Sequence, residues 1–298
     1  MDGYEVHLLL RPGYEAWRID EIADHCVIHL ADLTDAESVM RAFRIAAPEC
    51  VFHLAAYGAY PHQRDLSKAF ATNVVGLSNI FDACKAHSVS TVINAGSSSE
   101  YGLMDHPPTE FECVEPNSAY AISKVAATHL CRQVARTSNL EITTLRLYSV
   151  YGPFEEPKRF MPTLIVHGLE ERLPPLVDPA VARDYVYVDD VVEAFLLAAG
   201  TPMEEPGAIF NIGTGRQVSI SEAVETIREQ LGIIDAPRWG SMENRSWDTD
   251  VWVSNPSKAF EQIGWVAGTS FEAGLEQMTR WLGERANFEF YRPRVNRA

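Results

Sequence analysis

Apolar and polar positions follow two periods along the first half of the chain. Short runs rich in β-branched and other apolar residues predict strands at residues 6–10, 26–29, 50–54, 91–94 and 142–146. Between them, apolar residues recur at i, i+3 and i+4, which predicts helices over 35–46, 66–87 and 118–137. Strands that alternate with helices are typical of βαβ units, so we expect an α/β fold with a parallel sheet covered on both faces.

The pattern changes after Gly152-Pro153, where proline-rich, arginine-bearing segments replace the regular alternation. Shorter helices are predicted at 189–199, 221–231 and 271–284. We therefore expect a first domain over residues 1–152, with returning segments near 184–215, and a smaller lobe over 153–298. The arginine-rich tail, with Arg292, Arg294 and Arg297, is expected to be a frayed end.

Charge and cysteine content narrow the classes of function. The 298 residues carry 41 Asp and Glu against 25 Lys and Arg, a net charge of −16, which disfavours general binding to nucleic acid or to an anionic membrane. The 5 cysteines are scattered without a C-x-x-C spacing, so neither a disulfide framework nor a metal site is expected. With no 18-residue apolar run and no signal-type N-terminus, the sequence predicts a cytoplasmic protein.

Tyr120 and Lys124 are predicted to lie one turn apart on the same face of a helix. A nearby ammonium group lowers the pKa of a phenol, and such a phenol can exchange a proton with an alcohol or ketone. The pair is short enough to occur by chance. The structural alternative is a lysine extended beside a half-buried tyrosine.

A serine cluster, Gly96-Ser-Ser-Ser-Glu-Tyr-Gly102, follows the predicted strand 91–94. Ligands bind beyond the carboxyl ends of strands in open α/β sheets, so these hydroxyls could hold a substrate oxygen, although a solvated turn is the alternative. The order along the chain favours the first interpretation: a strand, the serines, about twenty residues, the Tyr/Lys helix, and then a strand that ends in Leu145-Arg-Leu-Tyr-Ser-Val-Tyr-Gly-Pro153.

With this order of motifs, the sequence resembles the extended short-chain dehydrogenase/reductase family, in its nucleotide-sugar epimerase/dehydratase/reductase branch, over nearly the whole chain. The resemblance implies a Rossmann-type doubly wound parallel sheet, a smaller C-terminal substrate-binding lobe, and NAD or NADP as cofactor. It also implies that Tyr120 is the catalytic acid/base, Lys124 its activator and Ser97 the assisting hydroxyl.

Further motifs of the resemblance carry over to the cofactor site. They are Asp32-Leu33, His53-Leu-Ala-Ala56, Asn73 in Thr-Asn-Val-Val-Gly76, and the strand end at Tyr148. For Asn73 a structural hydrogen bond is the alternative role. The residues expected to bind cofactor are Arg11, Asp32, Leu33, Leu54, Ala55, Ala56, Asn73, Tyr120, Lys124 and Tyr148.

The second lobe contains three segments that resemble substrate-binding motifs of the family. They are Ala182-Arg-Asp-Tyr-Val-Tyr-Val-Asp-Asp190, Asn211-Ile-Gly-Thr-Gly215, and Arg245-Ser-Trp-Asp248 ahead of Asn255-Pro-Ser257. Guanidinium groups bind phosphate oxygens bidentately, so Arg183 and Arg245 are expected to hold a nucleotide diphosphate. The residues expected to bind substrate are Ser98, Ser99, Ser149, Arg183, Arg245 and Asp248.

The sequence departs from the family pattern in two places. No Gly-x-x-Gly-x-x-Gly turn precedes the strand at 6–10, which suggests that about 25 to 30 residues, with the first strand and its phosphate-binding turn, are missing from this sequence. Arg11 stands where NAD-specific members have an acidic residue, which favours NADP slightly over NAD.

The implied reaction is hydride transfer between nicotinamide and a sugar carbon. Family dehydratases carry an Asp-Glu pair where this chain has Ser98-Ser99, so we expect a nucleotide-sugar epimerase or 4-ketoreductase. The alternatives are an NADP-dependent carbonyl reductase acting on a non-nucleotide substrate, and a non-catalytic Rossmann-fold binding protein. A homodimer through helices 66–87 and 118–137 is expected from the resemblance.

Overall fold

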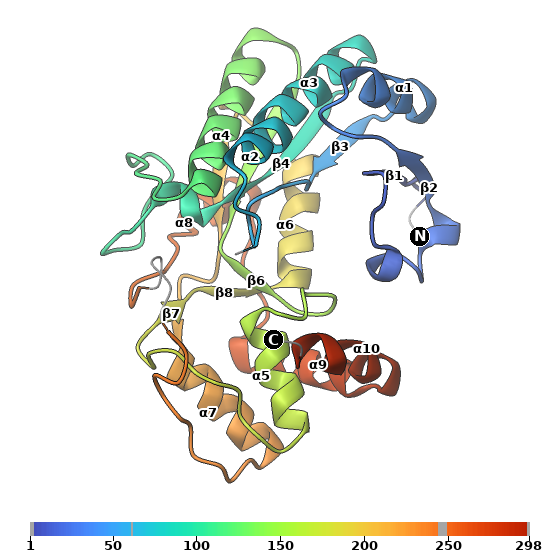
Figure 1. The fold of residues 1–298 in the computed structure, drawn as a ribbon. Coiled ribbons are helices and arrows are strands. Elements are labelled where there is room, and N and C mark those ends of the chain that lie inside the picture. Colours follow the sequence, from blue (N-terminus) through green and yellow to red (C-terminus); the bar gives the residue numbers. More distant parts are fainter. Residues whose placement is uncertain (1–2, 61, 244–248, 297–298) are drawn as a thin grey trace. The chain divides into compact units, whose positions relative to one another are not determined.

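The structure is a computed structural model that describes residues 3–60, 62–243 and 249–296, and the chain forms two compact units (Figure 1). Unit 1 comprises Met1–Gly102, Val114–Arg146 and Ala198–Phe210. Unit 2 comprises Leu103–Cys113, Leu147–Leu197 and Asn211–Ala298. The chain therefore passes between the units several times, and the segment Leu103–Cys113 belongs to unit 2 although it precedes the second half of unit 1.

The strands predicted in the first half of the chain all form, within a residue or so at most ends. The first two make a parallel pair, and the third pairs in parallel with the fourth in a sheet of order β3-β4-β5-β9. The chain therefore has the α/β architecture with parallel strands that the sequence predicts. The bounds are β1 His7–Leu10, β2 Val27–Leu30, β3 Cys50–His53, β4 Thr91–Ser97, β5 Glu141–Leu147 and β9 Ile209–Ile212.

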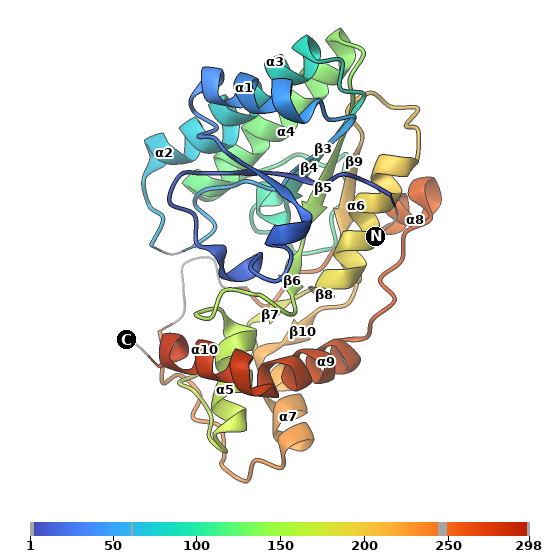
Figure 2. The same ribbon diagram turned by 90° about the vertical axis from the view of Figure 1, so that its right-hand side faces the viewer.

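Helices α1 to α4 lie together on one face of these strands (Figure 2). Each of three begins at an acidic or hydroxyl residue whose side chain accepts a backbone N–H of the first turn: Asp35 for α1, Asp65 for α2 and Ser118 for α4. The bounds are η1 Ala16–Arg18, η2 Ala23–His25, α1 Ala36–Ala46, α2 Leu66–Phe70, η3 Ala71–Val75, α3 Gly76–Ala86, η4 Ser98–Tyr101 and α4 Ala119–Thr137.

The helix predicted over 66–87 is interrupted. Its residues Ala71–Val75 form a π-helical turn between α2 and α3. A π turn holds one more residue than an α turn, which shifts the side chains that follow it around the axis. Asn73 is buried in this turn, four residues after buried Ala69 and four before buried Leu77. A polar residue therefore lies on the buried face of this helical segment.

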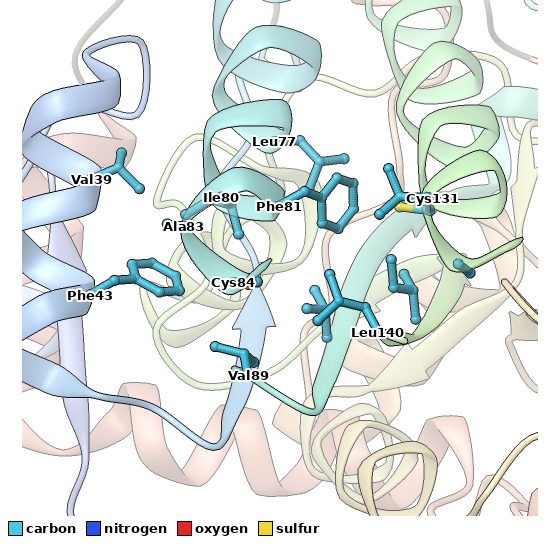
Figure 3. Close-up of a cluster of buried hydrophobic side chains, with 14 of the residues drawn as sticks. Val39, Phe43, Leu77, Ile80, Phe81, Ala83, Cys84, Val89, Cys131 and Leu140 are labelled. Carbon is cyan, nitrogen blue, oxygen red and sulfur yellow. The ribbon is translucent and has the colours of Figure 1, made fainter. Parts of the chain in front are cut away.

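Buried side chains of α1, α3 and α4 meet in an apolar core (Figure 3). Val39 and Phe43 of α1, Phe81 of α3 and Cys131 of α4 belong to this core, together with Leu140 just before β5. Fully burying a large apolar side chain stabilises a fold by about 1.5 to 3 kcal/mol. The core therefore fixes α4, and with it the Tyr120-Lys124 pair.

In the part of the chain that the structure describes, β1 and β2 form a separate two-stranded sheet and do not join β3. Apolar side chains of this region are exposed: Leu30 on β2, and Phe52 and Leu54 on or next to β3. The central strands β4, β5 and β9 are mostly buried. The β1–β2 and β3 strands therefore lack the cover that the central strands have.

The described part of unit 2 is built from short strands and helices. β6 pairs in parallel with β8, and β7 pairs antiparallel with β10. Helices α5, α8 and α10 have no counterpart among the predicted elements. The bounds are β6 Ser149–Tyr151, α5 Phe160–Leu169, β7 Ala182–Arg183, β8 Tyr185–Tyr187, α6 Val188–Gly200, β10 Val218–Ser219, α7 Ile220–Leu231, α8 Ser257–Ile263, α9 Phe271–Gly283 and α10 Arg285–Val295.

The prediction of a frayed tail is wrong for Arg292 and Arg294, which lie in α10. Arg292 donates a 2.6 Å hydrogen bond from Nε to Glu170, and the buried Tyr291 donates from its hydroxyl to the carbonyl oxygen of Glu155. These contacts with the residue that ends α5 and with the loop before α5 stabilise α10, whose own sequence has little apolar period. Arg297 lies outside the described residues.

No helix among the described residues is long and apolar enough to span a bilayer. Within the same residues, no group of three or more His, Cys, Asp and Glu side chains is arranged to hold a metal ion.

Glu155, in the loop between β6 and α5, carries a buried carboxyl group. Its Oε1 accepts a 2.8 Å hydrogen bond from Arg159, and its Oε2 is buried without a hydrogen-bond partner. Burial raises the pKa of Glu155 from 4.5 to about 7, against the opposing effect of Arg159. The folded chain therefore binds more protons than the unfolded chain between these two values, and stability falls as the pH rises through this window.

We expect Glu155→Gln to increase the free energy of unfolding by about 2 to 3 kcal/mol at pH 8 and to change it little at pH 5. Urea unfolding at both pH values measures the effect. The matched control is Glu276→Gln, because exposed Glu276 also pairs with an arginine four residues on, Arg280. Equal effects of Glu155→Gln at pH 5 and pH 8 would contradict the assignment.

Candidate active site

The Tyr120-Lys124 pair lies in the first turns of α4, as the spacing predicts. Ser118 starts the helix by accepting the Ala121 N–H at 3.1 Å. Lys124 is only 3% exposed, and its ammonium group donates a 2.5 Å hydrogen bond to the carbonyl oxygen of Ala95 in β4. Burial lowers the pKa of Lys124, and the negative charge of Glu100 opposes that change. Lys124 is therefore a fixed, buried cation one turn from the phenol.

A loop after β3 packs against Tyr120. A Cβ at Gly58 would lie 3.2 Å from the Cβ of Tyr120, and the φ of Gly58 is +105°, so this close approach requires glycine. Asn73 holds the loop: its Oδ1 accepts from the Tyr57 N–H and its Nδ2 donates to the Tyr57 carbonyl, both at 2.8 Å. The contact between loop and helix restricts the position of the Tyr120 side chain.

Asn73 also connects this loop to α4. Its Nδ2 donates to the hydroxyl of Ser123 at 2.8 Å, and Ser123 donates to the backbone carbonyl of Tyr120 at 2.7 Å. The Asn73 amide thus binds other parts of the protein through both its oxygen and its nitrogen. These bonds correspond to the structural role that the sequence left open for Asn73.

Ser97 ends β4 and begins the 3₁₀ turn η4. Its Oγ lies 2.7 Å from the hydroxyl of Ser99 and accepts the Ser99 N–H at 3.2 Å. In return, Glu100 accepts the Ser97 N–H at 2.9 Å, which completes a capping box. Ser97 and Ser99 are half-buried and Ser98 is buried, so the cluster is an ordered turn at the end of a strand.

The other residues predicted for the cofactor follow the strands of unit 1. Leu54, Ala55 and Ala56 are exposed after β3, where a ligand could approach their backbone. Asp32 is exposed after β2, and hydrogen bonds from the Thr34 N–H and hydroxyl lower its pKa. These positions are compatible with the predicted roles.

Two more predicted cofactor residues, Leu33 and Arg11, differ in their surroundings. Leu33 packs against the apolar core, and its carbonyl oxygen accepts a 2.7 Å hydrogen bond from Asn79. Arg11 is exposed directly after β1. The geometry therefore gives Leu33 a core role as well, and leaves Arg11 accessible.

Unit 2 has its own polar centre at Asp184, which is fully buried. Its Oδ1 accepts from the N–H and hydroxyl of Thr214 at 2.8 and 2.7 Å. Its Oδ2 accepts from the N–H of Gly215 at 3.0 Å and from the N–H and hydroxyl of Ser254 at 3.0 and 2.6 Å. Asp184 thus joins the Arg-Asp-Tyr and Asn-x-Gly-x-Gly motifs to the segment before α8.

The residues predicted to bind substrate in unit 2 lie near this centre. Ser149 begins β6, and its N–H donates to the Asp184 carbonyl at 2.9 Å. Arg183 is half-buried, with its guanidinium 5.3 Å from the ring centroid of Trp252. Tyr148, predicted for the cofactor, is buried. Arg245 and Asp248 lie outside the described residues.

Comparison with known proteins shows the family of the chain. The profile of the NAD dependent epimerase/dehydratase family matches residues 1–213. The chain belongs to this family. The chain is 27% identical over 269 residues to UDP-glucuronate 4-epimerase 4 of Arabidopsis thaliana, an alignment that covers 84% of this chain and 61% of the relative. It is also 24% identical to Protein CapI of Staphylococcus aureus, over 93% of both chains.

Solved structures show the same fold. The UDP-glucose 4-epimerase of Thermotoga maritima, solved with UDP-glucose, superposes with a TM-score of 0.85 at 26% identity, over 94% of this chain and 91% of that one. The Thermus thermophilus UDP-glucose 4-epimerase in complex with NAD gives 0.84 at 28% identity, over 95% and 92%. The chain therefore has the Rossmann-like α/β fold with a parallel sheet that the sequence predicts.

The sequence alone does not single out four residues with buried polar contacts: Ser123, Glu100 and Arg146 of unit 1, and Asp184 of unit 2. The pattern Ser97-x-x-Glu100 is a readable capping-box signal, and Asp184 lies within a quoted motif. Arg146 gave no signal, because it occurs in an apolar strand whose neighbours do not predict a partner. Its partner is Glu100, whose Oε2 accepts from the Arg146 Nε at 3.0 Å.

Proposed function

We propose that this epimerase/dehydratase is an NAD-dependent 4-epimerase of a UDP-sugar. The observation that carries the proposal is the ordered set in unit 1: Ser97 at the end of β4, and Tyr120 with buried Lys124 at the start of α4. The names of relatives such as UDP-glucuronate 4-epimerase 4 and UDP-glucose 4-epimerase support the substrate class. The chain spans 61% of the length of the first of these relatives.

The proposed chemistry assigns each group a separate task. Tyr120 would take the proton of the sugar hydroxyl and would return it to the same oxygen once the carbon has its new configuration. NAD, held by Lys124 and the exposed backbone after β3, would supply the hydride acceptor and donor. Lys124 stabilises the phenolate as a fixed positive charge. The Ser97 hydroxyl donates to the reacting sugar oxygen.

NAD is the cofactor supported by the solved relatives, one of which was determined with NAD. The comparisons do not support the expected tilt towards NADP. The exposed position of Arg11 is compatible with a 2′-phosphate contact, and a preference for NADP therefore stays a prediction of the sequence alone.

The assay that tests the proposal incubates the protein and NAD with UDP-, dTDP-, CDP- and GDP-sugars, and follows sugar products together with nicotinamide absorbance. Isomerisation of a UDP-sugar without a net absorbance change supports the epimerase. Net oxidation of NADH or NADPH would identify a 4-ketoreductase instead. Absence of turnover with every nucleotide sugar would contradict the proposed function.

We further propose that a strand and a glycine-rich turn beyond residues 1–298 complete the sheet next to β1 and β3. The separate β1–β2 pair and the exposed Leu30, Phe52 and Leu54 support this. The coding sequence upstream of Met1 tests it. A glycine-rich strand-turn-helix there is the expected result, and its absence would remove the proposal.

A homodimer is the expected assembly, and unit 1 offers a surface for it. Leu66 of α2, Val75 of the π turn and Ile122 of α4 are large apolar side chains that are 45 to 53% exposed. We expect the protein to elute as a dimer and Ile122→Asp to produce monomers, because a buried, unpaired carboxylate opposes association. Light scattering after size exclusion measures this. Exposed Ile45→Asp on α1 is the control, and a wild-type monomer would contradict the proposal.

A further inference from the structure

The buried acidic residue Glu100 has no part in the chemistry proposed above. It lies in η4 with 0% exposure, and its charge partner Arg146 in β5 is 3% exposed. Their side chains join through the 3.0 Å hydrogen bond from Nε to Oε2. Removing two charges from water costs several kcal/mol per ion, so burying this pair stabilises the fold less than apolar side chains of the same volume would.

Glu100 and Lys124 bind the same short segment at the end of β4. Glu100 accepts the Ser97 N–H at 2.9 Å, and Lys124 donates to the Ala95 carbonyl at 2.5 Å. The residue between, Gly96, has no room for a side chain: a Cβ there would lie 2.8 Å from Thr144 Cγ2 and 3.0 Å from Glu100 Oε1. An anion and a cation therefore hold consecutive peptide groups just before the serine turn.

Arg146 in turn is held on two sides. Besides its bond to Glu100, its guanidinium lies 4.5 Å from the ring centroid of Tyr101. Its Nη1 is buried without a hydrogen-bond partner. An arginine that leaves a donor unsatisfied contributes less as a hydrogen-bonding group than as a charge that compensates Glu100.

We infer that Glu100, compensated by Arg146, is a positioning residue for the reaction: it fixes the Ser97 backbone and supplies the negative charge that keeps Lys124 an ammonium group. This inference rests on the proposed function, because it assigns Ser97 and Lys124 their catalytic roles. It deepens that function by naming a buried ion pair that acts through two catalytic groups without touching substrate.

The charges around Lys124 support the role of Glu100 in keeping Lys124 protonated. Glu100 raises the pKa of Lys124, whereas burial lowers it. His53 of β3 is neutral, because burial, with Lys124 contributing, lowers its pKa to about 3. The titratable groups that interact electrostatically with Lys124 are Glu100 of η4, Cys131 of α4 and His53 of β3. Tyr120 lies one turn before Lys124 on α4.

The test compares Glu100→Gln, Arg146→Gln and the double variant with wild type, by steady-state kinetics from pH 6 to 10 and by thermal unfolding. Glu100→Gln is expected to lower kcat about tenfold with KM within about twofold. The fall of kcat at high pH should move about one pH unit lower in this variant, because Lys124 loses its proton at a lower pH. A purely structural role would not move that fall.

Arg146→Gln leaves a buried carboxylate without its cation, and its Tm should fall by about 8 °C or more. The double variant should recover over half of that loss while the fall of its kcat at high pH stays shifted. Glu205→Gln, which breaks the partly exposed 3.3 Å pair with Arg132 in the same unit, is the control expected to keep wild-type kcat and pH profile.

Two results would overturn the inference. One is a Glu100→Gln variant with wild-type kcat and a wild-type pH profile. The other is a double variant in which both the pH profile of kcat and the Tm return to wild-type values. If wild type turns over no nucleotide sugar, the proposed function fails instead. The thermal unfolding cycle still reports then whether Arg146 compensates Glu100.

Discussion

Tyr120→Phe is expected to lower kcat for UDP-sugar epimerisation by about 10²- to 10⁴-fold while KM changes by less than about threefold. The substitution removes only the phenolic oxygen, which is the group that exchanges a proton with the sugar hydroxyl. The ring continues to pack against the loop at Gly58, where an added Cβ would lie 3.2 Å from the Tyr120 Cβ. Substrate binding should therefore persist while the reaction stops.

The measurement is steady-state turnover together with a titration of NAD and of the UDP-sugar. Tyr4→Phe is the control, since Tyr4 is 82% exposed. Lys124→Met gives a second test, because it removes the activating cation from a site that is 3% exposed. It should lower kcat without lowering the Tm, since an apolar side chain of similar length replaces a desolvated charge. Turnover within tenfold of wild type in Tyr120→Phe would refute Tyr120 as the acid/base.

Asp184→Asn is expected to destabilise the fold of unit 2 by about 3 to 5 kcal/mol. Both carboxylate oxygens act only as acceptors, and together they take five hydrogen bonds from Thr214, Gly215 and Ser254. An amide presents a donor in place of one oxygen. In one orientation the amide NH2 faces the N–H of Thr214, and in the other it faces the N–H groups of Gly215 and Ser254, so at least one backbone donor then faces another donor.

Urea unfolding followed by tryptophan fluorescence measures this loss. Asp178→Asn is the matched control, because the exposed Asp178 carboxylate accepts the N–H of Ala180, and an asparagine oxygen can accept the same bond. The control should stay within about 0.5 kcal/mol of wild type. A loss below about 1 kcal/mol in Asp184→Asn would show that the five hydrogen bonds contribute little net stability.

Local rules were sufficient for the elements of the first half of the chain. Strand bounds such as Cys50–His53 and helix bounds such as Ala119–Thr137 follow from hydrophobic periods and from a capping serine. The same rules failed for α10, whose arginine-rich sequence gives little apolar period. Its stability comes from partners elsewhere in the chain, such as Glu170 for Arg292.

In the candidate site, too, some features follow from local sequence and others from tertiary packing. The four-residue spacing of Tyr120 and Lys124 places them on one helical face without reference to the rest of the protein. That Lys124 is buried and bonded to Ala95, 29 residues earlier, depends on how α4 packs on β4. The sequence alone does not decide whether Asn73 binds cofactor or makes a structural hydrogen bond. In the folded chain Asn73 lies in the π turn, and its side chain hydrogen-bonds Tyr57 and Ser123.

By itself the sequence determined the α/β alternation, the Tyr/Lys pair and the serine turn at the end of a strand, because each depends on contacts between residues close in the chain. The tertiary structure alone decided which buried charges and polar groups meet: Glu100 with Arg146, 46 residues apart, and Asp184 with Ser254, 70 residues apart. A buried polar group must find a partner. Which partner it finds is set by the packing of strands and helices that local sequence does not specify.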